Sequence, residues 1–600
     1  MVRPKPSKQS LGGTSKNHEP VSGQRSIPGV RRQVLKPDRG VRRCIIASRT
    51  SEHTLTSKQH KAMNPVKRTQ KDATTWSQKW RSLPWKRLRI RLFKLQVRMW
   101  KAARRNDKAT VLFLQRLILR SYSARLLAIR QVSQLNAGKK TAGVDGKKNL
   151  SFKDRFQLES VLRAKVSTWN PSKLREIPIP KKNGKTRLLK IPTIKDRAWQ
   201  HLAKSAIEPF HEAHFHARSY GFRPGRSCWD AQKLIFNQLN SNANGIHKKI
   251  VEVDIEKCFD KIDHNELMNR VIAPCELKQG LWRTLKSGVS PEFPDQGTPQ
   301  GGVISPLLAN IALDGIEDSG GSIQKPYMYK GKTSYIKKHN TGIRYADDMV
   351  FICHPEADPK EILSRIKSFL SKLGCKVSKS KTRIVASTDG FDFLGWNFRV
   401  KPDGKFKCVP SKDNYINFKK KVKAIVNSSC YGAKVKATKL APVVRGWRTY
   451  HKFCDMSKSS HSLFLTRRRA WRVFNKERKQ NRYSVNLLIQ KSFPSVGYSV
   501  NKHVMVQKSR SIYDGDFVYW SKRNSKHYDG PTSKALARQN RLCGICNIPL
   551  IDGEPVHLHH VDGDHSNWSP RNLIAVHQSC HQIHHMSKRN DSKVGNLKFF

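Results

Sequence analysis

The spacing of apolar residues predicts two amphipathic helices early in the chain. Residues 85–98 and residues 109–120 carry apolar side chains three and four positions apart, the repeat of one helix face. Arginine or lysine fills most of the polar positions in both segments. Such a polar face is either simply solvated or in contact with phosphate groups. The sequence therefore predicts two basic helices and leaves both interpretations of their polar faces open.

A later segment follows the pattern of a β-hairpin. Residues 175–192 place β-favouring residues on both sides of Asn183-Gly184, a strong hairpin-turn signal. The basic residues near this turn are Lys181, Lys182, Lys185 and Arg187. Raised on a β-ribbon, they suit a grip on a triphosphate or on a template backbone. An ordinary surface hairpin has the same composition, so this alternative stays open.

Two further segments place carboxylates at the ends of predicted strands. A β-rich run ends in Asp254, and residues 342–352 place Asp347 and Asp348 between two apolar, β-favouring arms. Because side chains alternate along a strand, we expect the adjacent aspartates at the tip of a hairpin. An acid-rich turn is the plain interpretation of that pair alone. Facing Asp254, however, the pair could hold two divalent metals about 3.5–4 Å apart, which would activate a 3′-hydroxyl and stabilise a leaving pyrophosphate.

Small residues dominate the chain between these acids. Residues 297–310 begin with a glycine-rich stretch that includes Gln300 and Gly301, and they end in a helix-like run. Small side chains let a backbone approach a nucleic-acid duplex closely. We therefore expect a loop at this point that leads into a helix.

The charge balance indicates a polyanionic partner. The 600 residues include 116 lysines and arginines against 44 aspartates and glutamates, a net charge of +72. Basic residues occur throughout the chain and 37% of residues are hydrophobic, enough for packed cores, so nucleic acid is the expected partner. No apolar run approaches the ~18 residues of a membrane span, and most of the 12 cysteines are isolated. These features predict a soluble, intracellular protein with no membrane partner.

The N-terminal residues 1–75 have a different character. They are rich in arginine, lysine, serine and glycine and lack apolar periodicity, so we predict a disordered basic extension. The alternatives are an organellar transit peptide, a loose RNA-binding arm, or sequence read through ahead of a later start at Met63.

The remaining cysteines group near the C-terminus and predict a metal site. Cys543 and Cys546 form one pair of ligands, and His577 with Cys580 forms a second, a set that suits a tetrahedral structural Zn²⁺. A purely structural zinc knuckle is the plain interpretation. Further polar candidates lie between and beside the two pairs: His559, His560, Asn572, His581, His584 and His585.

The order of the central motifs resembles the palm of a reverse transcriptase. The Asp254 strand, the loop with Gln300 and Gly301, and the Asp347-Asp348 hairpin follow one another as in that family, and residues 219–227, 379–382 and 391–396 agree with its further blocks. The resemblance implies that Asp254, Asp347 and Asp348 bind two catalytic Mg²⁺ ions. It also implies that Phe259 excludes ribonucleotides and that Gln300 and Gly301 grip the template. The residues it places near the incoming dNTP are Lys185, Arg187 and Lys381.

The flanking segments narrow the resemblance to group II intron-encoded proteins. The glycine-punctuated loop at residues 141–146 and the block at residues 222–225 fit this family, and residues 442–451 resemble its maturase domain, called X. By that resemblance Arg445, Trp447 and Tyr450 bind intron RNA. Packing within a helical thumb is the alternative role of Trp447.

The C-terminal motif resembles an HNH endonuclease. The resemblance implies that His560 is the general base, that His559 and His581 hold one divalent metal, and that Asn572 braces the loop that orients the base. His577 stands where such proteins commonly have a cysteine. The assignment of metal ligands among His577, His581, His584 and His585 therefore stays open.

Together these features predict a multidomain α+β protein: a right-hand polymerase with fingers and palm, a helical thumb with domain X, and a ββα-metal HNH zinc domain. The expected boundaries are an extension at 1–75, fingers and palm at 76–400, thumb and domain X at 401–482, a DNA-binding segment at 483–540, HNH at 541–590 and a tail at 591–600. Residues 401–481 are expected to be basic and helical.

The resemblance implies a protein that binds its intron RNA and helps it splice, nicks target DNA, and copies the intron into DNA from the nicked end. The expected location is a bacterial cytoplasm or an organelle, and a homodimer stays open. One alternative is a splicing factor with an inactive polymerase, which the intact Asp254, Asp347 and Asp348 argue against. The other is a retron-type reverse transcriptase, which the domain X and HNH motifs argue against.

Overall fold

The computed structural model describes residues 75–180, 186–288, 295–322, 326–329, 332–335, 340–477, 481–525, 528, 530–550, 556–582 and 584–585. The chain divides into two units, and the second, Pro65–Phe600, contains all of these residues. The predicted N-terminal extension, apart from Thr75, and the tail at 591–600 lie outside them. None of the described helices combines the length and apolar character that a bilayer span requires.

The N-terminal part of the described chain is helical, and both predicted basic helices are confirmed. Leu88, Leu92 and Met99 bury one face of the first helix, as the apolar spacing predicts. The Asp107 side chain caps the second helix by accepting a hydrogen bond from the Thr110 amide. The helices of this region are α2 (Trp85–Arg104), α3 (Lys108–Arg120), α4 (Tyr122–Arg130), α5 (Phe152–Lys165) and α6 (Ile194–His214).

The predicted hairpin at residues 175–192 is also confirmed. Strands β1 (Arg175–Pro180) and β2 (Thr186–Ile191) pair antiparallel, with Arg175 opposite Ile191. The turn between them, residues 181–185, lies outside the described residues.

A four-stranded antiparallel sheet carries the central motifs. Its order is β6-β7-β3-β8, and its strands are β3 (Lys249–Val253), β6 (Thr341–Tyr345), β7 (Asp348–Ile352) and β8 (Arg383–Ala386). Both the β3 strand and the hairpin at residues 342–352 are therefore confirmed. Alternation sends Val251 and Val253 into one hydrophobic core and Ile250 into another, so both faces of the sheet are covered.

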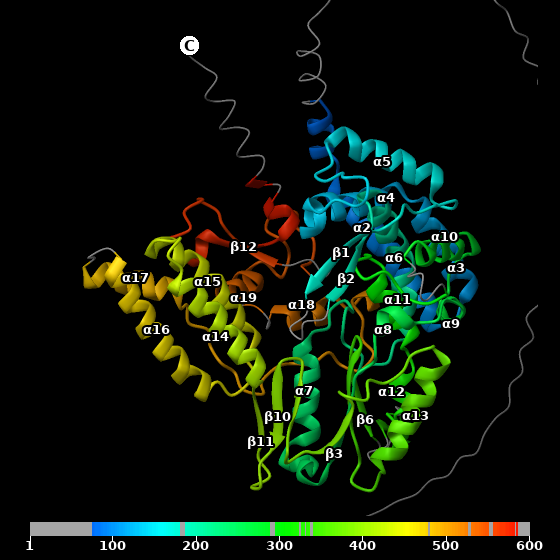
Figure 1. Ribbon diagram of the computed structural model, residues 1–600. Helices are drawn as coiled ribbons and strands as arrows, with labels where there is room; N and C mark the ends of the chain where they lie inside the picture. The colour runs from blue at the N-terminus through cyan, green and yellow to red at the C-terminus, as the bar shows by residue number, and fades with distance from the viewer. Residues whose placement is uncertain are drawn as a thin grey trace, which may run out of the picture. The chain divides into compact units, whose positions relative to one another are not determined.

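The helices of this region are α7 (Cys228–Leu239), α8 (Cys258–Lys261), α9 (His264–Arg270), α10 (Cys275–Lys286), α11 (Ser305–Ala312), α12 (Ile316–Ser319) and α13 (Pro359–Lys372). Helices α7, α12 and α13 pack against this sheet, and the other helices of this region lie toward its upper end in Figure 1. The loop at residue 297 onward leads into α11, as expected. A separate two-stranded hairpin consists of β4 (Pro326–Tyr329) and β5 (Lys332–Tyr335).

The segment from residue 401 onward differs in part from the prediction. Strands β9 (Phe391–Phe393), β10 (Trp396–Val400) and β11 (Phe406–Pro410) form a sheet of order β11-β10-β9. Residues 406–410 are therefore a strand, and the expectation of helix for them was wrong. Their pairing with β10 buries Cys408 and brings Phe406 against Phe398, with ring centroids 6.1 Å apart.

Four helices then form one bundle with its own core, coloured yellow in Figure 1. They are α14 (Lys412–Asn427), α15 (Ala433–Tyr450), α16 (Ser457–Glu477) and α17 (Arg482–Ser492). Val485 and Ile489 of α17 belong to this core, so the helical unit continues past the boundary expected at residue 482.

The C-terminal region combines short helices with a hairpin. Its elements are α18 (Phe517–Ser525), α19 (Gly530–Arg538), β12 (Val556–His560) and β13 (Leu573–His577), and residues 578–582 are helical. Leu536 of α19 packs with Ala575 and Val576 of β13 in a small core that includes Cys543. Short helical turns elsewhere are Gln131–Leu135, Ala137–Lys140, Ser241–Ala243, Gly245–His247, Ile512–Asp514 and Pro570–Asn572.

Candidate active site and metal centres

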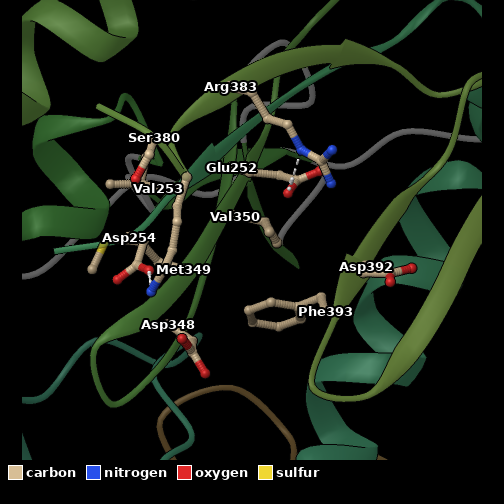
Figure 2. Close-up of a pocket in the computed structure, with 11 residues that line it drawn as sticks. Glu252, Val253, Asp254, Asp348, Met349, Val350, Ser380, Arg383, Asp392 and Phe393 are labelled. Atoms are coloured by element: carbon tan, nitrogen blue, oxygen red, sulfur yellow. Dashed lines mark hydrogen bonds and ion pairs between the residues drawn. The ribbon is translucent and has the colours of Figure 1, made fainter. Parts of the chain in front are cut away.

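Two of the predicted catalytic acids meet at one end of the central sheet. Asp254 directly follows β3 and Asp348 begins β7. Val253 pairs with Met349 in the antiparallel register, so the next pair along the strands is Asp254 and Asp348. Both line a pocket of about 360 Å³, and Figure 2 shows them together at one end of it. Asp347 lies beside them in the two-residue turn between β6 and β7.

The electrostatics of these acids favour a bound cation. Desolvation by the surrounding protein, together with the charges of Asp347 and Asp254, raises the pKa of Asp348 to about 6. The ammonium group of Lys381 forms an ion pair with Asp254, and this hydrogen bond raises the pKa of Lys381. The carboxylates thus already attract a positive side chain, which indicates that the donor set suits Mg²⁺.

Buried contacts fix the backbone of the turn between β6 and β7. The Arg344 guanidinium is buried, pairs with Glu317 at 2.7 Å, and donates to Asn310 at 2.9 Å. Its Nη1 also lies 3.4 Å from the carbonyl oxygen of Ala346. Ala346 has a positive φ of 60°, so this turn conformation depends on such supports.

The loop with Gln300 connects the acids to the N-terminal hairpin. The Thr298 amide donates to the carbonyl oxygen of Phe259 at 2.5 Å, and the Lys190 amide of β2 donates to that of Gln300 at 2.8 Å. Gly301 has a φ of +129°, and a Cβ there would lie 2.6 Å from the Lys190 carbonyl oxygen. Phe259 itself is partly buried against the main core. Lys185 and the Arg187 side chain lie outside the described residues.

The pocket contains residues that the sequence analysis did not single out as site residues. Glu252 lies two positions before Asp254 on β3, on the same face of the sheet, and accepts a hydrogen bond from Arg383 at 3.0 Å. Asp392 and Phe393 line the pocket as well, and Figure 2 shows all four. Because side chains alternate along a strand, the position of Glu252 two residues before Asp254 could have identified it from the sequence. The position of Arg383 could not be identified in this way, because it depends on the pairing of β3 with β8.

The three predicted RNA-binding residues of α15 differ in their surroundings. Arg445 is exposed. Trp447 stacks on Phe418 with ring centroids 4.2 Å apart, and its Nε1 donates to Asn414 at 2.8 Å. Tyr450 stacks on Trp396 at 4.6 Å, and its hydroxyl donates to the carbonyl oxygen of Leu394 at 2.7 Å. Protein contacts therefore occupy both aromatic rings, which are partly buried, and Arg445 is the most exposed of the three residues.

The four predicted zinc ligands come together near the C-terminus. The ligand atoms of Cys543, Cys546, His577 and Cys580 all lie within 4.8 Å of one another. The His577 Nδ1 is 3.4 Å from the Cys546 Sγ and 3.8 Å from the Cys580 Sγ, close to the edge of about 3.6 Å that zinc bond lengths imply for a tetrahedron. Hydrogen bonds from Cys546 and Cys580 lower the pKa of Cys543, which favours the thiolate that zinc binds.

A second cluster consists of histidines. His559, His581 and His585 bring ligand atoms within 4.8 Å of one another, whereas His584 is not in this group. Desolvation and the neighbouring imidazoles lower the pKa of His581 to about 4, so its ring is neutral at pH 7 and can bind a metal. The His581 and His585 Nε2 atoms are 3.1 Å apart. His557, which the sequence analysis did not single out, also approaches His581, at 3.3 Å between Nδ1 atoms.

His560 and Asn572 lie on either side of one loop. His560 follows His559 on β12 and contacts Trp568, with ring centroids 5.3 Å apart. Its Nε2 is buried and makes no hydrogen bond within the described part of the chain. Asn572 accepts from the Asp562 amide at 3.0 Å and donates to the Asn567 carbonyl oxygen at 2.9 Å. Asn572 thereby holds the loop that begins after His560.

Three protein-family models match consecutive parts of this chain. Residues 80–162 match the N-terminal domain of reverse transcriptase, residues 179–398 match reverse transcriptase (RNA-dependent DNA polymerase), and residues 416–488 match the group II intron, maturase-specific domain. Maturase-like protein 1 of Euglena gracilis is 38% identical over 422 residues, 69% of this chain and 88% of that protein. The chain belongs to the group II intron maturase and reverse transcriptase family.

A more distant relative is also a group II intron-encoded protein. The group II intron-encoded protein LtrA of Lactococcus lactis subsp. cremoris is 29% identical over 330 residues, 45% of this chain and 54% of that protein. Among solved structures, a Candida albicans telomerase with an RNA fragment has a TM-score of 0.27 at 14% identity, covering 56% of this chain and 64% of that one. This score is too low to carry an argument. The three family matches end at residue 488, so the C-terminal metal clusters are interpreted from their geometry.

Proposed function

We propose that the chain is an RNA-directed DNA polymerase that uses two Mg²⁺ ions bound by Asp254, Asp347 and Asp348. The observation that carries this proposal is the convergence of the acids at the end of the central sheet, with Asp254 and Asp348 opposite each other in register. Bound Mg²⁺ would supply activation of a primer 3′-hydroxyl and neutralisation of the leaving pyrophosphate. Gln300 and Gly301 would hold the template, and Phe259, Lys185, Arg187 and Lys381 would contact the dNTP.

Primer extension on an RNA template tests this proposal. Removal of a metal-binding carboxylate is expected to lower the rate about a hundredfold or more, because each metal contributes several kcal/mol at the transition state. The variants are Asp347→Ala/Asp348→Ala, against Asp358→Asn as a matched control. Asp358 caps α13, a role that asparagine fills as well. Wild-type protein that fails to extend but promotes splicing would favour the maturase-only alternative.

The match to the maturase-specific domain supports a second role, binding of group II intron RNA to assist its splicing. Arg445 is an exposed basic residue of α15 that suits phosphate contact, as are Lys434 and Lys439 of the same helix. The net charge of +72 supplies the sequence-independent part of such binding. Filter binding tests it: cognate intron RNA should bind more tightly than an unrelated structured RNA of equal length. A retron-type enzyme would show no such preference.

The C-terminal region supports a third role, HNH-type cleavage of target DNA. The Cys543, Cys546, His577 and Cys580 set would hold structural zinc, and His559, His581 and His585 would hold the catalytic divalent metal at the scissile phosphate. His560 Nε2 would accept a proton from the attacking water, and Asn572 would hold the loop beside it. Together with the polymerase, this activity would allow the intron to be copied into a nicked target site.

A nicking assay on target DNA, within the full chain, tests this role. His560→Ala should abolish nicking while primer extension continues, and the distant His247→Ala should change neither activity. Metal analysis should find one tightly bound zinc per chain, lost in Cys543→Ser. Zinc binding with no nicking under any metal condition would favour the purely structural zinc knuckle.

A further inference from the structure

A separate polar pocket lies away from the acids of the central sheet, and its lining includes Ser579 and Gln582, which flank Cys580 and His581 in the chain. It has a volume of about 180 Å³, and residues of the N-terminal helical region supply most of its lining. Three of its lining side chains are cationic: Arg130, Lys139 and Arg155. The others include serine, asparagine and glutamine, and no acidic side chain of the described residues lines it. Its chemistry is that of an anion site.

Arg155 is the residue that distinguishes this pocket from a basic surface. Its side chain is 8% exposed, and its Nε and Nη1 atoms are buried without a hydrogen-bond partner among the described residues. The guanidinium lies near the rings of Trp80, at 5.4 Å, and Phe152, at 4.7 Å. These aromatic faces favour a cation but accept no hydrogen bonds in the plane of the guanidinium. A buried charge without such partners is costly.

The nearby carboxylates on the same helix have other partners. Asp154 accepts hydrogen bonds from the Ser151 amide at 3.1 Å and hydroxyl at 2.7 Å, which completes the cap of α5. Glu159 pairs with Arg125 at 2.8 Å. Burial lowers the pKa of Arg155 to about 10, so the group remains charged at pH 7. The charge of Asp154 attracts the Arg155 guanidinium, but among the described residues neither of these carboxylates forms an ion pair with it, so the pocket presents a buried positive charge.

We propose that this pocket binds a phosphoryl group, with Arg155 as its buried anchor and Arg130 and Lys139 as further cationic contacts. Lys139 already donates to the carbonyl oxygen of Gln134 at 2.6 Å, and two of its three ammonium hydrogens remain for a ligand. The volume is below the roughly 300–1,000 Å³ of pockets for whole small molecules. It suits one phosphoryl group with water rather than a complete nucleotide. The group comes from the backbone of bound nucleic acid or from free phosphate or pyrophosphate.

Calorimetric titration of the full chain with inorganic phosphate and with pyrophosphate, in magnesium-free buffer of constant ionic strength, tests the proposal. The comparison is Arg155→Gln against Arg163→Gln, which removes the same charge from an exposed position of α5. Loss of a charge-assisted hydrogen bond should weaken phosphate binding about tenfold or more in Arg155→Gln. Arg163→Gln should bind as the wild type does.

A single-stranded RNA oligonucleotide then distinguishes the two sources. If bound RNA lowers phosphate affinity in the wild type but not in Arg155→Gln, the pocket takes a backbone phosphate. If bound RNA leaves the phosphate affinity of the wild type unchanged, the pocket takes the free ion. Circular dichroism checks folding, and Arg155→Lys, which keeps the charge but loses the planar fork, replaces a variant that does not fold. A folded Arg155 variant that binds phosphate as tightly as Arg163→Gln overturns the proposal. So does a wild type that binds no phosphate.

Discussion

At the scale of single residues, the proposed role of Asp348 as a metal ligand conflicts with the stability of the metal-free fold. Its pKa is raised from an ordinary value of 3.8 to about 6 by desolvation and by Asp347 and Asp254. The folded state therefore prefers the protonated carboxyl, and ionisation at neutral pH lowers the free energy of unfolding. The same ionised group is the one that a metal requires. The folded protein therefore contains electrostatic repulsion of Asp348 by Asp347 and Asp254, and a bound cation would remove this repulsion.

This conflict predicts that Asp348→Asn stabilises the metal-free protein at pH 7.5. The gain over wild type should shrink as the pH falls below about 6, since wild-type Asp348 then becomes protonated in the folded state. Thermal unfolding between pH 5 and 8 measures it. Added Mg²⁺ should stabilise the wild type and narrow the difference. A difference that stays constant across this pH range would show that charge repulsion is not its cause.

Arg445 and Trp447 are predicted to have different roles, Arg445 in RNA binding and Trp447 in the stability of the fold. Because Arg445 is exposed, Arg445→Ala should weaken intron RNA binding and leave the urea unfolding midpoint unchanged. Trp447→Ala should lower the free energy of unfolding by on the order of 2–3 kcal/mol, since it removes the stack on Phe418. RNA binding and urea unfolding of the same two proteins provide the comparison. Equal losses of stability would contradict these assignments.

At the scale of elements, the β6–β7 hairpin depends on a neighbouring segment. The Tyr220 amide donates to the carbonyl oxygen of Arg344 at 2.8 Å, and Ser219 bridges Arg344 in parallel. Gly221 then lies directly against the turn between β6 and β7: a Cβ there would be 2.3 Å from the Ala346 amide nitrogen. The block at residues 219–227 therefore acts as a support for Asp347.

Gly221→Ala is accordingly expected to displace the turn and reduce primer extension. Overpacking at such a contact costs about 1–3 kcal/mol, and here the displaced atoms directly precede Asp347, a proposed Mg²⁺ ligand. The measurement is the rate of extension as a function of Mg²⁺ concentration, where a shifted Asp347 should raise the concentration required. Gly432→Ala is the matched control, because its Cβ meets nothing within 4 Å. Unchanged Mg²⁺ dependence in Gly221→Ala would contradict the support role.

The elements that sequence reasoning identified are those with a local pattern. The apolar spacing of α2 and α3, the two arms of the hairpin at residues 175–192 and the two arms around Asp347-Asp348 each form a local pattern, and the structure contains these helices and strands. Strand β11 was missed because its strand conformation depends on pairing with β10 rather than on its basic sequence. Arg383 joins the pocket only through its register with Glu252. The packing of Trp447 and Tyr450 likewise depends on partners from other elements.

At the scale of the whole molecule, one buried acid joins segments far apart in the chain. Asp230, near the start of α7, is fully buried and accepts from Arg523 at 2.7 and 2.9 Å. The Val506 amide also donates to it at 3.0 Å, and the His503 Nε2 lies at the same distance. Burial opposes ionisation, but His503 and Arg523 hold the pKa of Asp230 well below its usual range. Sequence reasoning could not identify this role, because Arg523 lies 293 residues away.

Asp230→Asn should therefore detach the segment at residues 503–523 from α7. Removal of one partner from a buried ion pair costs about 3–5 kcal/mol, because it leaves Arg523 buried and uncompensated. Limited trypsin digestion at pH 7.5 should cleave this segment faster, and Asp403→Asn, at an exposed turn, should digest as the wild type does. In acid, with pepsin in place of trypsin, the wild type should approach the susceptibility of the variant, since the stabilisation is present above the ordinary pKa near 4 and is lost as the pH falls through the lowered pKa. Replacing both partners, in Asp230→Asn/Arg523→Leu, should restore part of the resistance to digestion, because it removes the buried charge of Arg523 as well. Digestion of Asp230→Asn at the wild-type rate would show instead that the aromatic packing of Trp520 against Gly225 holds the segment.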